Sequence, residues 1–127
     1  MQLATKFLLA NPYVLSRMPA FLLWMLGLNN QVTFISDLFN RYSPHIFSQD
    51  HIKNGIMNLG SSQWEIFNKI MSEINSRLPQ AVNGSNQIHT IINGIRVTIR
   101  FYLVDGAIKS VDAFVGWATR IIGELLK

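Results

Sequence analysis

The sequence contains no cysteine, and only 7 of its 127 residues are aspartate or glutamate. Without cysteine the chain can form no disulfide bond, no thiolate metal site and no cysteine nucleophile. The scarcity of carboxylates argues against a metal-dependent nuclease that holds its ions in an acidic cluster. The composition suits a reducing compartment, and it would also suit a secreted protein that unfolds and refolds without disulfides.

A long uninterrupted apolar run is also absent, although residues 1–28 are rich in apolar side chains. Two short runs in this segment are separated by Asn11-Pro12, Arg17 and Pro19. A transmembrane helix needs about 20 consecutive apolar residues, and a secretory signal needs a basic start and one continuous apolar block. The pattern favours a pair of buried or partner-covered helices. A membrane-active segment, a signal peptide and the trimmed end of a larger delivery polypeptide are the alternatives.

The remaining composition predicts one ordered domain. Apolar residues make up 49% of the chain and charged residues 14%, which argues against intrinsic disorder. We expect a single domain over residues 1–127, divided into an apolar helical segment (1–42) and a core (43–127). The net charge of +4 favours a polyanionic partner such as nucleic acid, or an acidic protein.

Helical periodicity is confined to the first two thirds of the chain. Residues 33–42 form one predicted helix, which Pro44 should end, and residues 49–59 form a shorter one. The clearest helix spans 63–77, with isoleucines at spacing four and Ser62 and Glu65 as an N-terminal capping box.

The last third shows the period of two that is typical of strands. Asn93-Gly94 and Asp105-Gly106 are two-residue hairpin turn signals, and apolar and polar residues alternate between them. This predicts a three-stranded meander over 87–115, followed by a tail (117–127) that is either a helix or a further edge strand. The predicted fold class is α+β, with N-terminal helices packed on a small twisted antiparallel β-sheet.

The two turns set the register of the meander and therefore the neighbours on each face. His89 should face Thr98, Gln87 should face Arg100, and Tyr102 should face Lys109. One face would then collect polar and basic side chains, namely those of His89, Arg96, Thr98, Arg100, Tyr102 and Lys109. A one-residue bulge in the third strand would bring Ser110 and Asp112 to this face instead.

This polar face has the parts of a metal-free nuclease that leaves a cyclic phosphate. Such an enzyme needs one group that accepts the 2′-OH proton, one that protonates the leaving oxygen, and cations that hold the phosphate. Histidine suits the proton transfers and arginine grips phosphate with two N–H groups. His89, Arg96, Arg100 and Lys109, with the Thr98 hydroxyl, are sufficient. The competing interpretation is a solvated outer face of a small sheet.

His45 and His51 lie six residues apart across a predicted turn and could converge on one pocket. A catalytic or phosphate-binding role and a purely structural turn both fit this arrangement. With Asp50 as the third ligand they make a poor metal site, and their spacing fits no zinc signature. We therefore expect no metal ion and no cofactor.

A series of scattered residues resembles the C-terminal toxin domains of bacterial contact-dependent growth inhibition and related polymorphic toxin systems, of the barnase/EndoU/colicin/RelE type of ribonuclease. The series comprises His45-Ile46-Phe47-Ser48, His51, Gly55-Ile56-Met57, Leu59-Gly60, Gly84-Ser85-Asn86-Gln87-Ile88, Ile92-Asn93-Gly94, Ile99-Arg100, Asp105-Gly106, Phe114, Gly116, Arg120 and Gly123. The resemblance covers residues 43–125 and leaves the apolar start unexplained.

The resemblance implies metal-independent RNA cleavage, with tRNA as the expected substrate, in the cytoplasm of a target cell. It further implies secretion or cell-surface delivery within a larger polypeptide, a cognate immunity protein and a host helper protein. His45, His51 and Arg100 would be catalytic, and the polar face adds His89. The substrate-binding residues would be Thr98, Ser110, Thr119 and Arg120, together with Arg96 and Lys109 of the polar face.

Two other functions remain open. The chain could be a non-enzymatic interaction module, such as an immunity or adaptor protein, whose sheet binds an acidic partner. It could also be a membrane-permeabilising toxin that uses residues 1–28.

Overall fold

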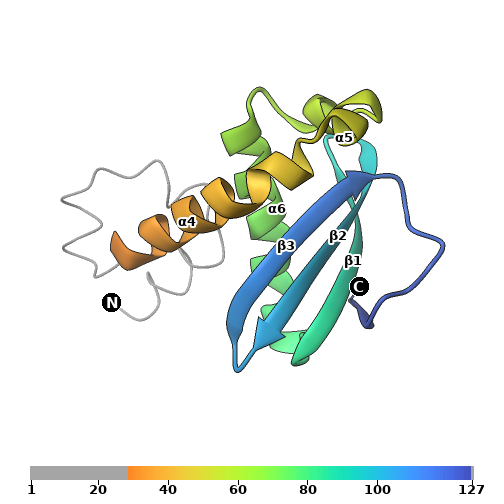
Figure 1. Ribbon diagram of the computed structural model, residues 1–127. Helices are drawn as coiled ribbons and strands as arrows, with labels where there is room; N and C mark the ends of the chain where they lie inside the picture. The colour runs from red at the N-terminus through yellow and green to blue at the C-terminus, as the bar shows by residue number, and fades with distance from the viewer. Residues whose placement is uncertain (1–28, 127) are drawn as a thin grey trace.

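The computed structural model describes residues 29–126, so the helices expected before residue 29 lie outside the described part of the chain. Figure 1 shows one long helix behind the sheet and another along the edge of the sheet. The elements are, in chain order, α4 (Asn29–Ile46), α5 (Gln49–Lys53), η1 (Ile56–Leu59), α6 (Gln63–Arg77), η2 (Leu78–Gln80), β1 (Gly84–Ile92), β2 (Ile95–Val104), β3 (Ala107–Val115) and β4 (Glu124–Leu126). The α+β class is confirmed.

The meander follows from its two turns. Asn93 and Asp105 adopt φ angles of 53° and 50°, and the glycine after each also has a positive φ, as a type I′ turn requires. β1 and β2 pair antiparallel with Ile92 opposite Ile95, which confirms the predicted pairings of His89 with Thr98 and of Gln87 with Arg100. The meander therefore fixes which side chains are neighbours on the open face.

The tail forms an edge strand, but it makes the sheet mixed rather than purely antiparallel. The strand order is β3-β2-β1-β4, and β4 pairs parallel to β1. Because β3 and β4 lie at opposite edges, residues 116–123 have to cross the width of the sheet. After this crossing β4 runs in the same direction as β1, and the alternating pattern of the meander alone does not predict that direction.

The buried side of the sheet is covered by α6, as the sequence predicts. Ile66, Ile70 and Ile74 are fully buried and belong to one core cluster with Ile88 and Ile99 of the sheet. Figure 1 shows α6 behind the three long strands. With that face closed by apolar packing, any site for an external ligand on the sheet has to lie on its other, open face.

The N-terminus of α6 is capped by the predicted serine and glutamate, with one change of partner. The Glu65 backbone N–H donates to the Ser62 hydroxyl oxygen at 3.1 Å, while the Glu65 carboxylate accepts from the Ser61 backbone N–H at 3.1 Å. The predicted capping box would have used the N–H of Ser62 instead. The hydrogen bond from the Ser61 backbone lowers the pKa of the half-buried Glu65 carboxyl.

The predicted C-terminal ends of two helices are wrong. Pro44 does not end α4, which continues to Ile46, because a proline in the last turn costs only one internal hydrogen bond. The helix expected over 49–59 is divided at Gly55, whose φ of 99° ends the helical path. Within residues 29–126 no helix combines the length and the apolar character that crossing a bilayer would require.

Gly123 is needed where β4 joins β1. Its φ is +75°, and a Cβ atom at this position would lie 2.0 Å from the Ser85 carbonyl oxygen. We expect Gly123→Ala to release β4 and expose Leu126, which lowers the free energy of unfolding by about 1.5–3 kcal/mol. Urea denaturation and amide exchange in β4 measure this effect.

Gly106→Ala is the matched control for that substitution. Gly106 has a similar φ of +81°, but a Cβ atom there would meet nothing within 4 Å. The difference between the two variants therefore isolates the close approach from the backbone strain. Equal destabilisation of both variants would show that the contact with Ser85 contributes nothing.

Candidate active site

A β-bulge in β3 determines what the open face presents. Leu103 pairs with Ile108 while Tyr102 pairs with Ser110, so Lys109 is the extra residue between them. The predicted pairing of Tyr102 with Lys109 is therefore wrong, and the bulge considered as its alternative is correct. Beyond the bulge Asp112 pairs with Arg100, which places a carboxylate beside the central arginine of the sheet.

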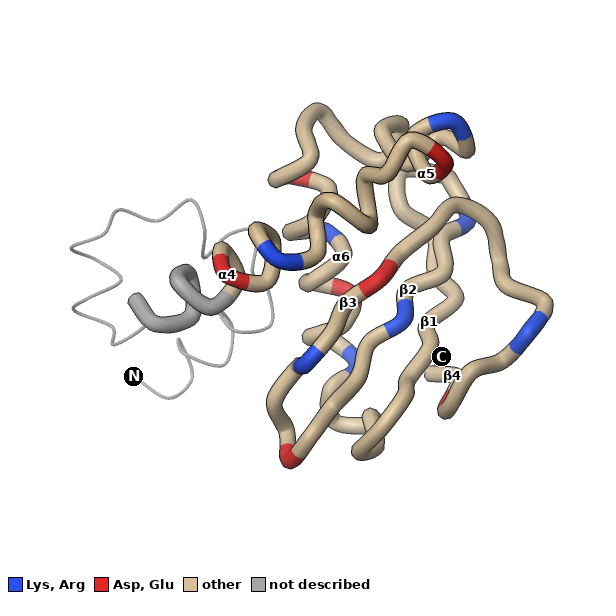
Figure 2. The backbone as a smooth tube through the Cα atoms, in the orientation of Figure 1, with Lys and Arg blue, Asp and Glu red and all other residues tan. Residues whose placement is uncertain are grey.

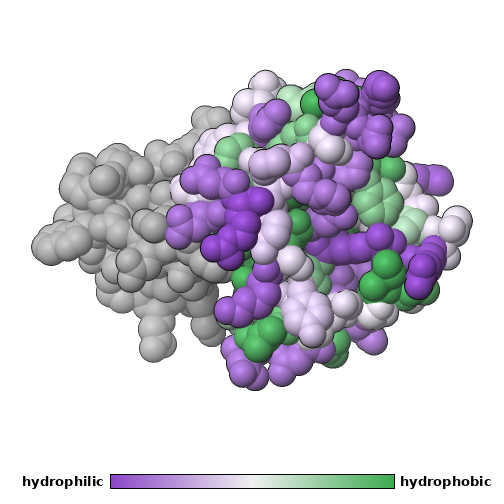
Figure 3. Space-filling view, in the orientation of Figure 1, coloured by the Kyte–Doolittle hydropathy of each residue, from purple (hydrophilic) through white to green (hydrophobic). Residues whose placement is uncertain are grey.

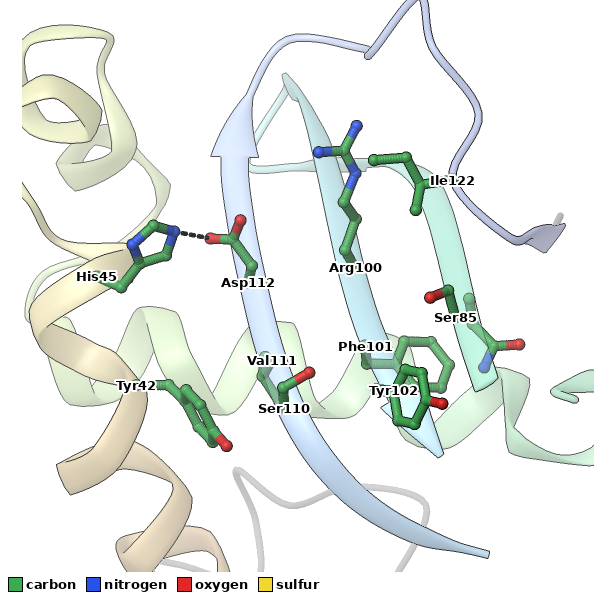
Figure 4. Close-up of a pocket in the computed structure, with 11 residues that line it drawn as sticks. Tyr42, His45, Ser85, Arg100, Phe101, Tyr102, Ser110, Val111, Asp112 and Ile122 are labelled. Atoms are coloured by element: carbon green, nitrogen blue, oxygen red, sulfur yellow. Dashed lines mark ion pairs between the residues drawn. The ribbon is translucent and has the colours of Figure 1, made fainter. Parts of the chain in front are cut away.

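The C-terminal end of α4 brings His45 to this carboxylate. His45 Nε2 lies 3.2 Å from Asp112 Oδ1, and Figure 4 shows the two side chains reaching toward each other from helix and strand. The Tyr42 hydroxyl, one turn earlier, donates to the carbonyl oxygen of Lys109 in the bulge. The bulge thus both positions Asp112 and provides a backbone acceptor that fixes α4 against β3.

His51 lies next to His45, as expected for two histidines that flank a turn. Their ring centroids are 5.4 Å apart. The Ser48 hydroxyl caps α5, and His51 Nδ1 lies 2.9 Å from the Ile46 carbonyl oxygen. A carbonyl can only accept, so Nδ1 carries a proton and Nε2 of the neutral ring keeps a free lone pair.

Arg100 occupies the centre of the open face. Its Nε donates to Gln87 Oε1 at 2.9 Å, and its guanidinium lies 5.0 Å from the centroid of the Phe114 ring. Phe114 in turn lies 6.3 Å from the His51 ring, centroid to centroid. Within residues 29–126 the two terminal guanidinium nitrogens have no hydrogen-bond partner. The side chain is held from two sides while the nitrogens that can grip a phosphate stay available.

His89 belongs to a second group on the far side of Arg100. Its Nε2 lies 3.2 Å from Gln87 Nε2, so the Gln87 amide connects it to Arg100. The imidazole stacks on the Trp117 indole at 5.6 Å with an interplanar angle of 4°, and the Arg96 guanidinium lies 4.7 Å from the same ring. His89 is therefore separated from the His45 and His51 pair by the width of β2.

The Thr98 hydroxyl, predicted to contact substrate, is fully used inside the protein. It donates to the Gly116 carbonyl oxygen at 2.7 Å and accepts from the Ala118 N–H at 2.9 Å, and the residue is completely buried. Its role is to fasten the crossing segment to the sheet. Thr119 and Arg120 are exposed in that segment, and Lys109 is exposed at the bulge.

A shallow groove of about 430 Å³ connects α4 with the open face. Figure 4 shows its lining, which comprises Tyr42, His45, Ser85, Asn86, Arg100, Phe101, Tyr102, Ser110, Val111, Asp112 and Ile122. Ser110 is thus in the groove, and His51 flanks it through its contact with His45. The groove can hold a polar ligand between a histidine pair and an arginine.

The open face carries both signs of charge rather than a continuous basic surface. Figure 2 shows lysines and arginines on separate elements with acidic residues between them, and in Figure 3 hydrophilic side chains predominate over β2 and β3 beside smaller apolar patches. A polyanion would therefore be recognised at specific points, above all at Arg100. Non-specific attraction to a uniformly positive surface would contribute less.

The carboxylate beside the histidines is Asp112 and not Asp50, the partner considered from the sequence. One ligand atom each of His45, His51 and Asp112 lies within 4.8 Å of the other two. Sequence reasoning also missed Phe114, which holds Arg100. The bulge was the one available signal for Asp112, because it decides whether that residue faces the core or the groove.

Comparison with known proteins identifies a toxin family. The family model described as bacterial toxin 35 matches residues 40–115. This range runs from the last turns of α4 to the end of β3 and includes both histidines of the pair, Arg100 and Asp112. No curated protein and no solved structure matches the chain significantly.

Proposed function

The chain belongs to the bacterial toxin 35 family, and on that premise we propose that it is an antibacterial endoribonuclease that cleaves RNA, with tRNA as the expected class, without a metal ion. The observation that supports this best is that His45 and Arg100 line the same groove, with His51 next to His45. Two imidazoles 5.4 Å apart and a guanidinium with free terminal nitrogens are the groups that cyclising cleavage of a phosphodiester needs.

In the proposed reaction His51 is the general base. Its Nε2 lone pair accepts the proton of the ribose 2′-OH, and the 2′ oxygen attacks the adjacent phosphorus. The bond from phosphorus to the 5′ oxygen of the next nucleotide breaks, which leaves a 2′,3′-cyclic phosphate. The Ile46 carbonyl, 2.9 Å from Nδ1, keeps the proton of the resting ring on the nitrogen away from substrate.

His45 is the general acid. Asp112 accepts a hydrogen bond from its Nε2–H and orients the ring, and in the proposed step the Nδ1–H protonates the departing 5′ oxygen. Arg100 donates from its terminal nitrogens to the non-bridging oxygens as negative charge develops on them. Asp112, Phe114 and Gln87 are positioning residues, since each acts through His45 or Arg100.

A toxin of this kind has to reach RNA inside another cell. We propose delivery to the target cytoplasm as part of a longer secreted or surface-bound polypeptide, with a cognate immunity protein that covers the groove in the producing cell. An acidic surface on that protein would complement Arg100 and Arg96. A host helper protein is a further partner in this proposal.

We expect purified protein to cleave total RNA fully in the presence of EDTA and to leave 2′,3′-cyclic phosphate ends. Gel electrophoresis and end-group analysis measure this, with protein denatured by heat as the control. Loss of cleavage in EDTA would contradict the metal-free mechanism. Expression without growth arrest or RNA damage would favour the interaction module, and leakage from anionic vesicles that requires residues 1–28 would favour the membrane toxin.

A further inference from the structure

We propose that His45, His51 and Asp112 form a binding site for one Zn²⁺ ion and that the bound ion inhibits RNA cleavage. The three ligand atoms lie within 4.8 Å of one another, on α4, α5 and β3. Two imidazoles and one carboxylate are a ligand set that zinc accepts. The inhibition rests on the proposed function, because zinc would occupy His51 Nε2, the proposed proton acceptor, and would replace the hydrogen bond between His45 Nε2 and Asp112. The zinc binding itself does not rest on that function.

The spacing of the ligands fits a small tetrahedral ion after minor side-chain rotation. Ligands about 2.0–2.1 Å from zinc lie roughly 3.3 Å from one another in a tetrahedron. His45 Nε2 and Asp112 Oδ1 are already 3.2 Å apart. The side chain of His45 is 66% exposed and that of Asp112 is 30% exposed. Both side chains therefore have room to rotate toward an ion while the backbones of α4 and β3 stay in place.

Hydrogen bonds outside the ligand set already orient two of the three ligands. His51 Nδ1–H donates to the Ile46 carbonyl oxygen at 2.9 Å, which leaves Nε2 free to bind the metal. The Ala113 N–H donates to Asp112 Oδ1 at 2.8 Å and fixes the carboxylate. Metal-binding histidines in proteins generally show this arrangement, with the second ring nitrogen bonded to a carbonyl or carboxylate.

The cation that suits this site is zinc rather than magnesium or calcium. Imidazole nitrogen prefers zinc and its neighbours among the transition metals, whereas magnesium and calcium take oxygen ligands. Arg100, the nearest fixed positive charge on the paired strand, is turned toward Gln87 and Phe114. Its guanidinium therefore leaves Asp112 available to the ion.

The test begins with binding, in the absence of RNA. Protein freed of metal with EDTA and then dialysed is titrated with ZnCl₂ by calorimetry, with MgCl₂ as the comparison. We expect one zinc per chain and no magnesium binding. His51→Ala and Asp112→Asn should each weaken zinc binding by more than about 10-fold, since loss of even an outer-shell partner typically costs that much.

His89→Ala is the matched control, because it removes the histidine that lies outside the cluster and should leave zinc binding unchanged.

Asp112→Asn keeps an oxygen acceptor for the Ala113 N–H, so this variant tests the negative charge of the carboxylate without removing the hydrogen bond that supports the fold. Zinc should raise the melting temperature of the wild-type protein and not that of Asp112→Asn. Nitrogen NMR of the rings should show the Nε2 of His51 shifted and its Nδ1 still protonated.

RNA cleavage then distinguishes the two proposals. We expect zinc to inhibit cleavage with a midpoint near the calorimetric Kd and EDTA to restore it. Absent or non-stoichiometric binding, or an equal loss in His89→Ala, would overturn the zinc site and leave the nuclease proposal standing. Cleavage that requires added zinc would overturn both the inhibition and the metal-free mechanism while the site itself remained.

Discussion

Replacement of His51 by alanine should reduce the rate of RNA cleavage by on the order of 10²–10⁴-fold, the usual contribution of a general base. His51 Nδ1 donates a hydrogen bond to the Ile46 carbonyl oxygen, which fixes the ring and leaves Nε2 free to accept a proton. Alanine is also a good helix former in the short helix α5, so the substitution removes a proton acceptor without disturbing the backbone.

Single-turnover cleavage of a defined RNA, in EDTA, measures this effect. Circular dichroism and the melting temperature confirm that the variant folds. His89→Ala provides the comparison, because His89 lies across β2 and connects to Arg100 only through Gln87, so its loss should cost less than that of His51. A His51→Ala protein that cleaves at the wild-type rate would exclude His51 as the base.

The local parts of the fold could be predicted from the sequence because each is determined by neighbouring residues. Asn93 and Asp105, each followed by glycine, specify tight turns, and an alternating pattern of period two joins them. The helix over 63–77 combines a strong apolar stripe with a serine cap. Such elements form the same secondary structure whichever residues pack against them.

Features that depend on distant contacts could not be predicted in the same way. The bulge at Lys109 is stabilised by α4, which packs against it. The Tyr42 hydroxyl of α4 donates a hydrogen bond to the Lys109 carbonyl oxygen. β4 is only three residues long and owes its place to the docking of Gly123 against Ser85. α4 continues past Pro44 to Ile46, whose side chain is fully buried in the core. No short window of sequence contains both partners of these contacts.

The residues of the candidate site also fall into those placed by local sequence and those placed by distant contacts. His45 and His51 are brought together by a local turn, so their spacing in the sequence was informative. Asp112 faces the groove only because of the bulge, and Thr98 looked available because the sequence does not show that Gly116 and Ala118 use its hydroxyl. Charge pattern alone identified Arg100, whereas its support by Phe114 is a tertiary contact.

Arg100→Lys should reduce cleavage by about 10²–10³-fold, the cost of losing one donor to transition-state charge, although the net charge does not change. Lysine has no second terminal nitrogen for a bidentate grip, no Nε–H for Gln87 and no planar group to stack on Phe114. The loss should appear mainly in kcat, because the developing charge is stabilised in the transition state more than in the bound substrate.

Steady-state kinetics on a short RNA separates kcat from KM in this variant, and Lys53→Gln serves as the control. Lys53 is exposed on α5, close in sequence to His51, and its substitution removes a positive charge outside the groove. If general attraction of RNA governed activity, Lys53→Gln would be impaired and Arg100→Lys would not. We expect the opposite, namely that Arg100→Lys loses activity and Lys53→Gln does not. Cleavage depends on the planar shape and the N–H donors of Arg100, which a positive charge alone does not supply.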